Sequence, residues 1–207
     1  MRVEHSILSF WRIIPLNCRY YPPDISTLLT SFVGNESAME TIKLAEEINE
    51  TADTFINLIS RFDNNQLNTI PFQGSWTAGQ VADHIIKATS GLPDERTRSV
   101  ARPPDEQVEG IKSVFLDFSL KFQSPDFIVP GAGPFDIDYI LHQLSRVKKQ
   151  NAATAMTEDT SKLCLDLELP GFGYLTRYEW LQFSVYHTQR HIHQLKNISE
   201  KILPVQL

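Results

Sequence analysis

Residues 178–195 read YEWLQFSVYHTQRHIHQL, and the spacing within this stretch decides how the chain is expected to fold. Successive residues of a helix lie about 100° apart, so Trp180 and Leu195 share one apolar face. His187 and His191 fall on that same face, one turn apart, and therefore point the same way. The stretch predicts a helix that offers two imidazoles to a single partner inside the protein.

Similar patterns elsewhere in the chain predict three more strong helices and one weaker helix. The strong helices are expected at about 37–62, 77–91, 137–156 and 177–201, and the weaker one at 105–121. Three strong helices begin with the spacing of a capping box, at Ser37 and Glu40, Thr77 and Gln80, and Thr176 and Glu179. Loops rich in Pro and Gly separate the helices, which favours an all-α fold, a four-helix bundle.

Two further local patterns complete this prediction. Asp136 is placed to cap the strong helix at 137–156. Leucines alternate with polar residues or cysteine over residues 163–169, and this period of two predicts an extended segment there.

The first 36 residues have a different character from the rest of the chain. They contain Pro15, Pro22 and Pro23 and show no helical period that can be extended. We expect an N-terminal extension with an irregular arm over 1–36 and one helical domain over 37–202. The arm is ordered, disordered, or an upstream extension of the reading frame, in which case Met39 is a candidate start.

Composition excludes several classes of partner. The chain has 207 residues and a formal net charge of −6, and its basic residues form no cluster beyond Lys148 and Lys149, so no nucleic acid is expected. No stretch approaches the roughly 20 apolar residues of a membrane span, and no signal peptide is recognisable, so no membrane partner is expected. Cys18 and Cys164 share no motif spacing, which favours a cytoplasmic location.

Helical phase separates the six histidines. His84 falls at the edge of an apolar stripe in the helix at 77–91, close enough to face the interior with His187 and His191. His142 and His193 point away from the apolar faces of their helices, and a sixth histidine, in the arm, belongs to no helix.

Three inward imidazoles need partners because burying them unpaired costs free energy. One divalent metal ion satisfies all of them and leaves a fourth position open, as in catalytic sites. Nitrogen ligands suit zinc, nickel, copper or iron, and no thiolate narrows the choice. The alternative is a structural bundle in which each histidine is hydrogen-bonded and no metal is held.

Two segments together resemble the DinB/YfiT-like family of metalloenzymes. Residues 74–85 read GSWTAGQVADHI, similar to a Trp-Ser/Thr-x-x-Gln/Glu-Val/Leu-x-x-His motif, and the stretch at 178–195 supplies the later His-x-x-x-His. The resemblance covers about 37–202. It implies a four-helix bundle of DinB-like type with His84, His187 and His191 as metal ligands, and zinc or nickel as the favoured ion. Formation of a homodimer is neither predicted nor excluded by the sequence.

Characterised members of the family that the chain resembles include S-transferases and isomerases that use low-molecular-weight thiols. The leading hypothesis is therefore a transferase that activates a bacillithiol-type thiol cosubstrate at the metal and joins it to a small-molecule substrate. The alternatives are a hydrolase that activates water at the metal and a non-catalytic metal-binding stress protein.

Several polar residues near the histidines have candidate roles. Arg190 is expected to bind a carboxylate of the thiol or to form a salt bridge. Gln194 and Gln80 are candidates to orient an imidazole, or are plain polar flanks. Asp83 is expected to project away from the site, which counts against a hydrolase. Trp76 and Trp180 are expected to pack in the core rather than to contact a substrate.

Overall fold

The computed structural model describes the backbone of residues 25–204 and the side chains of residues 38–204. The chain divides into two units, Met1–Glu36 and Ser37–Leu207. Most of the expected irregular arm, with His5 and Cys18, lies outside the described residues.

Within the described backbone, the main elements are six α-helices, which confirms the predicted all-α fold. They are α1 (Ile25–Ile59), α2 (Asn64–Leu67), α3 (Ala78–Thr89), α4 (Val108–Phe115), α5 (Ile137–Thr157) and α6 (Arg177–Ile202). A 3-10 turn, η1, spans Asp126–Ile128. Two short strands, β1 (Thr97–Arg98) and β2 (Leu163–Cys164), pair antiparallel with Thr97 opposite Cys164.

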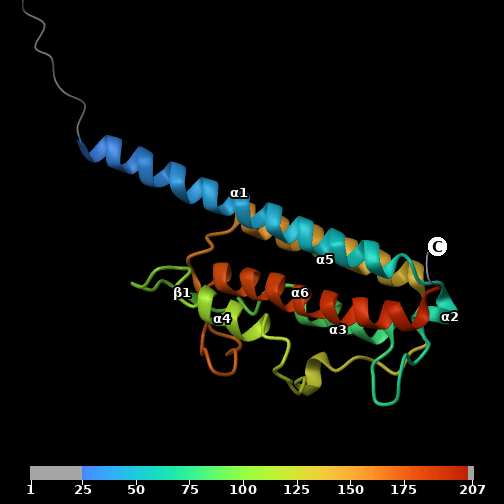
Figure 1. Ribbon diagram of the computed structural model, residues 1–207. Coiled ribbons are helices and arrows are strands. Elements are labelled where there is room, and N and C mark those ends of the chain that lie inside the picture. The colour runs from blue at the N-terminus through green and yellow to red at the C-terminus, as the bar shows by residue number, and fades with distance from the viewer. Residues whose placement is uncertain (1–24, 205–207) are drawn as a thin grey trace, which may run out of the picture. The chain divides into compact units, whose positions relative to one another are not determined.

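Helix α6 is the central element of the second unit. It packs against α3, α4 and α5, and Figure 1 shows α3 running behind it. Its side chains are buried without a break from Glu179 to Thr188, so this half of the helix has no solvent-facing side. Apolar side chains of α6 belong to both hydrophobic clusters of the core. Leu181 and Val185 join one cluster, and Leu195 and Ile198 join the other.

The part of α1 from residue 38 onward supplies the two clusters in turn. Leu44 and Ile48 pack in the cluster around the first half of α6, and Phe55 and Ile59 pack in the other. An ion pair between Lys148 on α5 and Asp53 on α1, 2.6 Å apart, joins the two helices at their surface. Helices α3 and α6 also pack against each other.

The start of α6 is fixed by its predicted capping box. The Thr176 hydroxyl accepts a hydrogen bond from the Glu179 amide at 3.1 Å, and the Thr176 amide donates to the Glu179 carboxylate at 2.8 Å. These bonds satisfy two amide groups that lack partners in the helix itself. They set the residue at which α6 begins and hence the phase of every side chain along it.

The Glu179 carboxylate also anchors the loop before α4. It is fully buried, and it accepts two bonds of 2.6 Å from the Arg102 guanidinium and one of 2.8 Å from the Gln107 amide. This bidentate pairing raises the pKa of Arg102 and is the strong form of a charge-assisted hydrogen bond. The loop at 99–107 is thereby tied to the first turn of α6.

The predicted start of the first helix at Ser37 is wrong. Helix α1 begins at Ile25, so Ser37 and Glu40 lie inside it and do not cap its end, and residues 25–36 of the expected irregular arm are helical. Extending a helix that already exists adds one hydrogen bond per residue fixed, which costs less than nucleating a new one. A capping-box spacing therefore does not interrupt a helix that continues through it.

The predictions for the shorter elements were partly wrong. The helix expected at 105–121 is limited to Val108–Phe115 because the Asp117 carboxylate accepts bonds from both the amide and hydroxyl of Ser119, a local turn that competes with helix. The extended segment at 163–169 forms a strand only at Leu163–Cys164, where β1 pairs with it. Helix α2 was missed, although Asp63 and Gln66 form a capping box there.

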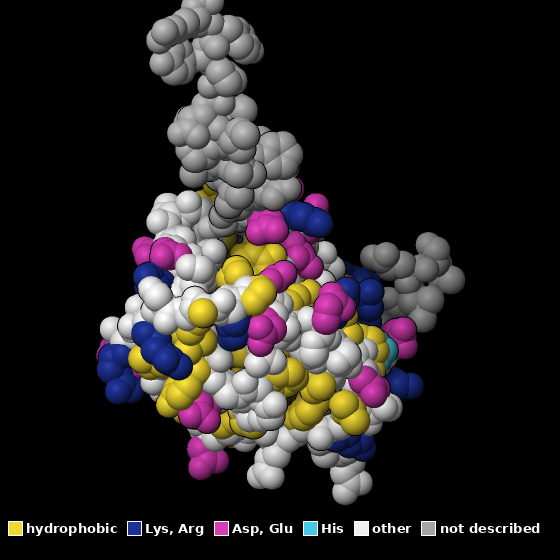
Figure 2. Space-filling view, turned by 90° about the vertical axis from the view of Figure 1, so that its left-hand side faces the viewer, with side chains coloured by type: hydrophobic (Ala, Val, Ile, Leu, Met, Phe, Trp, Pro, Cys, Tyr) yellow, Lys and Arg dark blue, Asp and Glu magenta, His cyan; other side chains and the backbone are white. Residues whose placement is uncertain are grey.

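The surface shown in Figure 2 carries a mixture of charges. On the described part of this face, basic side chains are dispersed among acidic and hydrophobic ones and form no continuous basic area. None of the helices in the described part of the chain has the length and hydropathy needed to cross a membrane.

We predict that Glu179→Gln destabilises the protein by about 3 kcal/mol, because it leaves the Arg102 guanidinium without its charged partner. Urea unfolding followed by circular dichroism measures the loss. Glu109→Gln is the control, since Glu109 is exposed and pairs only weakly with Lys112 at 3.8 Å. Equal stability of the two variants would contradict the anchoring role of Glu179.

Candidate metal centre

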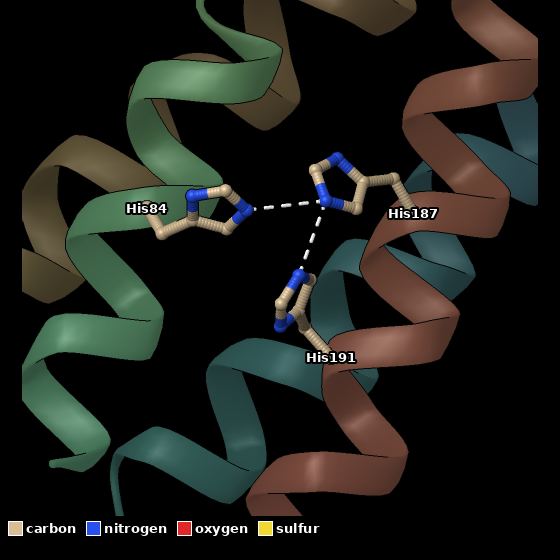
Figure 3. Close-up of side chains that lie close together, drawn as sticks. All are labelled: His84, His187 and His191. Atoms are coloured by element: carbon tan, nitrogen blue, oxygen red, sulfur yellow. Dashed lines mark hydrogen bonds between the residues drawn. The ribbon is translucent and has the colours of Figure 1, made fainter. Parts of the chain in front are cut away.

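The structure brings together the three histidines that helical phase selected. His84 projects from α3, and His187 and His191 project from α6 toward it (Figure 3). The Nε2 atom of His187 lies 3.2 Å from that of His84 and 3.1 Å from that of His191. Two nitrogen ligands of a tetrahedral zinc ion lie about 3.3 Å apart, given bonds of about 2.0–2.1 Å. The three side chains are therefore within reach of one ion.

All three imidazoles are buried and uncharged at neutral pH. Their exposed fractions are 2% for His84, 6% for His187 and 9% for His191. Burial lowers the pKa of His84, lowers that of His191 to about 3, and lowers that of His187 well below its usual range. A neutral imidazole keeps a nitrogen lone pair, which is the form that binds a metal ion.

Two carbonyl oxygens determine which nitrogen of His84 and His191 carries the hydrogen. The Nδ1 atom of His84 lies 2.8 Å from the backbone oxygen of Ile128, and the Nδ1 atom of His191 lies 2.8 Å from Oε1 of Gln194. A carbonyl oxygen only accepts hydrogen bonds, so both Nδ1 atoms are donors. The Nε2 atoms of these two rings are therefore bare and point toward His187.

Hydrogen bonding within the cluster leaves a polar atom unsatisfied. His187 has one hydrogen, and placed on Nε2 it can serve only one of the two bare Nε2 atoms beside it. Its Nδ1 atom is buried and has no hydrogen-bond partner among the described residues. A buried polar group without a partner costs about 1–3 kcal/mol. A cation shared by the three Nε2 atoms would give each of these lone pairs a partner and move the His187 hydrogen to Nδ1, so the donor set fits a bound divalent metal.

Aromatic rings enclose the cluster. The Trp76 ring lies 5.1 Å from the ring of His84 and 6.4 Å from that of His191, measured between centroids. Phe115 and Phe183 lie 5.7 Å and 5.1 Å from the ring of His187. Apolar walls strengthen electrostatic interactions inside the site because they exclude water. Trp76 therefore packs as predicted and also forms one wall of the site.

One face of α3 holds the loop that orients His84. Lys87 donates to the Val129 carbonyl at 2.9 Å, and Asp83 accepts from the Gly131 amide at 2.8 Å. Asp83 and Lys87 also pair with each other at 2.8 Å. Since His84 donates to Ile128 in the same loop, three side chains of one helix fix residues 128–131 and with them the orientation of the His84 ring.

The other polar residues predicted to lie near the histidines make different contacts from one another. Gln194 orients His191, as one of its two predicted roles required, whereas Gln80 completes the cap of α3 and reaches the Gly131 carbonyl at 3.4 Å. Arg190 donates to backbone carbonyls of Phe115, Asp117 and Leu120 and forms no salt bridge among the described residues, while the expected contact with a thiol carboxylate stays a prediction. His142 and His193 are exposed, as predicted.

Sequence reasoning missed the contributions of Ile128 and Phe115. The carbonyl of Ile128 acts through the backbone, so its residue type carries no signal. Phe115 lies within the helix expected at 105–121, and only its position at the end of α4 places it against His187. Cys164 is buried in the core, which raises the pKa of its thiol to about 12, and it takes no part in the cluster.

Comparison with known proteins agrees with this site. The family described as the DinB superfamily matches residues 47–195, a range that contains all three histidines. The chain is 25% identical over 147 residues to "Uncharacterized protein YuaE" of Bacillus subtilis (strain 168), covering 70% of this chain and 91% of that protein. No solved structure matches the chain. The buried three-histidine group fits a metal-binding protein, and the chain belongs to the DinB superfamily.

Proposed function

We propose that the protein is a metal-dependent transferase that activates a low-molecular-weight thiol of the bacillithiol type at the three-histidine site. The observation that carries the proposal is the convergence of three neutral Nε2 atoms within an aromatic enclosure. Three protein ligands leave room for an exogenous one, which is the arrangement of catalytic sites. Zinc or nickel suits imidazole ligands.

The residues of the chain have distinct tasks in this proposal. His84, His187 and His191 would hold the ion, and Ile128 and Gln194 keep two of these rings in the ligand tautomer. A divalent ion held there acts as a Lewis acid that favours the ionised form of a thiol. The aromatic walls exclude water that would compete with the thiol for the substrate.

The transfer step then needs no nucleophile from the protein. The thiol loses its proton to solvent, and the thiolate sulfur attacks an electrophilic carbon of the second substrate. A carbon–sulfur bond forms as the leaving group departs with its bonding electron pair. Cys164 is unsuited to this task because its buried thiol stays protonated at neutral pH.

A hydrolase has less support from the same site. Such enzymes commonly place a carboxylate beside the attacking water as a general base. The group of potential ligands in the described residues consists of the three histidines alone. Asp83, on the same helix as His84, is engaged by Lys87 and by the Gly131 amide.

We predict that purified wild-type protein contains a divalent metal and binds bacillithiol only in the metal-loaded form, because the thiol sulfur needs the ion. Mass spectrometric metal analysis and isothermal titration on one preparation measure both properties. His187→Ala should lose both, and His142→Ala, which changes an exposed histidine on α5, should keep both.

Two other outcomes of this experiment would contradict the metal site or the thiol transferase. Metal-free wild-type protein would refute the metal site and support a bundle in which the histidines are only hydrogen-bonded. Metal-loaded protein that binds no thiol from a panel of biological thiols would refute the transferase and favour a hydrolase or a non-catalytic metal-binding protein.

We predict that Gln194→Ala weakens metal binding about 10–100-fold, because the His191 ring loses the acceptor that holds its hydrogen on Nδ1. Competition with a chelator of known affinity measures the change. Gln194→Glu, which keeps an acceptor oxygen, should lose less, and Asn197→Ala, an exposed change on the same helix, should lose nothing. Wild-type metal affinity in Gln194→Ala would show that the 2.8 Å contact between Gln194 Oε1 and His191 Nδ1 does not affect how strongly His191 binds the ion.

A further inference from the structure

Arg190 stands on α6 between two histidines of the site, yet its guanidinium points to the backbone of another segment. It donates to the carbonyl oxygens of Phe115 at 3.2 Å and Asp117 at 2.9 Å, and also to that of Leu120. Phe115 is the last residue of α4, where carbonyl groups lack partners within the helix. A cation at this end of a helix is favourable, so Arg190 closes the C-terminus of α4.

The segment that Arg190 holds, residues 115–122, is called here the cover. Within the cover, the Phe115 ring packs on the His187 ring, and the Phe122 ring stacks on the Phe115 ring with centroids 5.5 Å apart. The Arg190 guanidinium lies over the Phe122 ring at 4.7 Å from the centroid. Rings therefore run in contact from the buried His187 through Phe115 to the exposed Phe122, and Arg190 binds the Phe115 carbonyl and the Phe122 ring.

A second contact ties the cover to α6. The ring of Phe118 stacks on that of His193, with centroids 4.2 Å apart and planes inclined by 2°. Both side chains are exposed, so this contact gains little from burial. The guanidinium of Arg190, which makes three hydrogen bonds and one ring contact, is the stronger anchor.

The cover lies where access to the site is restricted. His187 is only 6% exposed, and Phe115 is one of the rings that shield it. An ion or thiol that approaches His187 from the side of Phe115 meets these rings. Residues 117–120 and 122 are exposed, so this part of the cover has few core contacts, and we expect it to move at low cost once its anchor is released.

From this geometry we infer that Arg190 is a positioning residue that holds the aromatic cover over the three-histidine site and sets the rate at which ligands enter and leave it. The inference rests on the proposed function for its role in catalysis. It concerns rates of access, whereas the histidines and Gln194 determine the affinity of the site for an ion.

The test compares Arg190→Ala with wild type by two readouts. In metal-free protein, diethyl pyrocarbonate modifies accessible histidines, and mass spectrometry follows His187 with exposed His142 as internal reference. In zinc-loaded protein, a chromogenic chelator in excess reports the rate of zinc release. We expect both rates to rise by at least about tenfold, since hydrogen bonds to a charged group are lost, with His142 modified at an unchanged rate.

Two further variants keep the inference falsifiable. Phe122→Ser removes an exposed ring beneath Arg190 and should raise both rates by a smaller factor, even if Arg190→Ala fails to fold. Arg146→Ala, an exposed arginine on α5, is the matched control and should change neither rate.

The outcomes separate this inference from the proposed function. Wild-type rates in folded Arg190→Ala and in Phe122→Ser would overturn the inference while leaving the metal site intact. Wild-type protein that takes up no zinc would refute the metal site, and the modification rate of His187 in metal-free protein would still decide whether Arg190 holds the cover.

Discussion

Two carbonyl oxygens, from Ile128 and Gln194, hold the hydrogens of two buried imidazoles away from the centre of the site. The bare Nε2 atoms of His84 and His191 consequently face the Nε2 atom of His187 at 3.2 Å and 3.1 Å. One hydrogen on His187 cannot serve both, and burial disfavours protonation of any of the three rings. The site is arranged for a cation, and the surrounding fold maintains that arrangement.

The fold maintains it by fixing two helices and the loops beside them. The buried Glu179 sets the first turn of α6 and joins it to Arg102 and to the loop before α4. Along α3, the side chains beside His84 bind the loop that supplies its carbonyl partner. Along α6, Arg190 binds the segment whose Phe115 ring covers His187. Residues next to the histidines in sequence thus control the loops that orient and enclose them.

The sequence predicted the parts of this arrangement that depend on helical periodicity. Three and four-residue spacing selected the inward histidines and placed the start of α6 at Thr176, because side-chain direction in a helix follows from position alone. It did not predict that Arg190 binds carbonyls or that Ile128 orients His84, because backbone groups are the same in every residue and the loops come from distant positions. The start of α1 was misplaced because the capping-box spacing at Ser37 and Glu40 lies inside a helix that continues through it.

We infer that one divalent ion binds to three imidazoles from α3 and α6. Anomalous diffraction from crystals of the metal-loaded protein, recorded at the absorption edge of the ion, locates it directly. We expect a single peak about 2.0–2.1 Å from the Nε2 atoms of His84, His187 and His191. A peak elsewhere in the molecule, or ligation that leaves out His84, would contradict a shared three-histidine site.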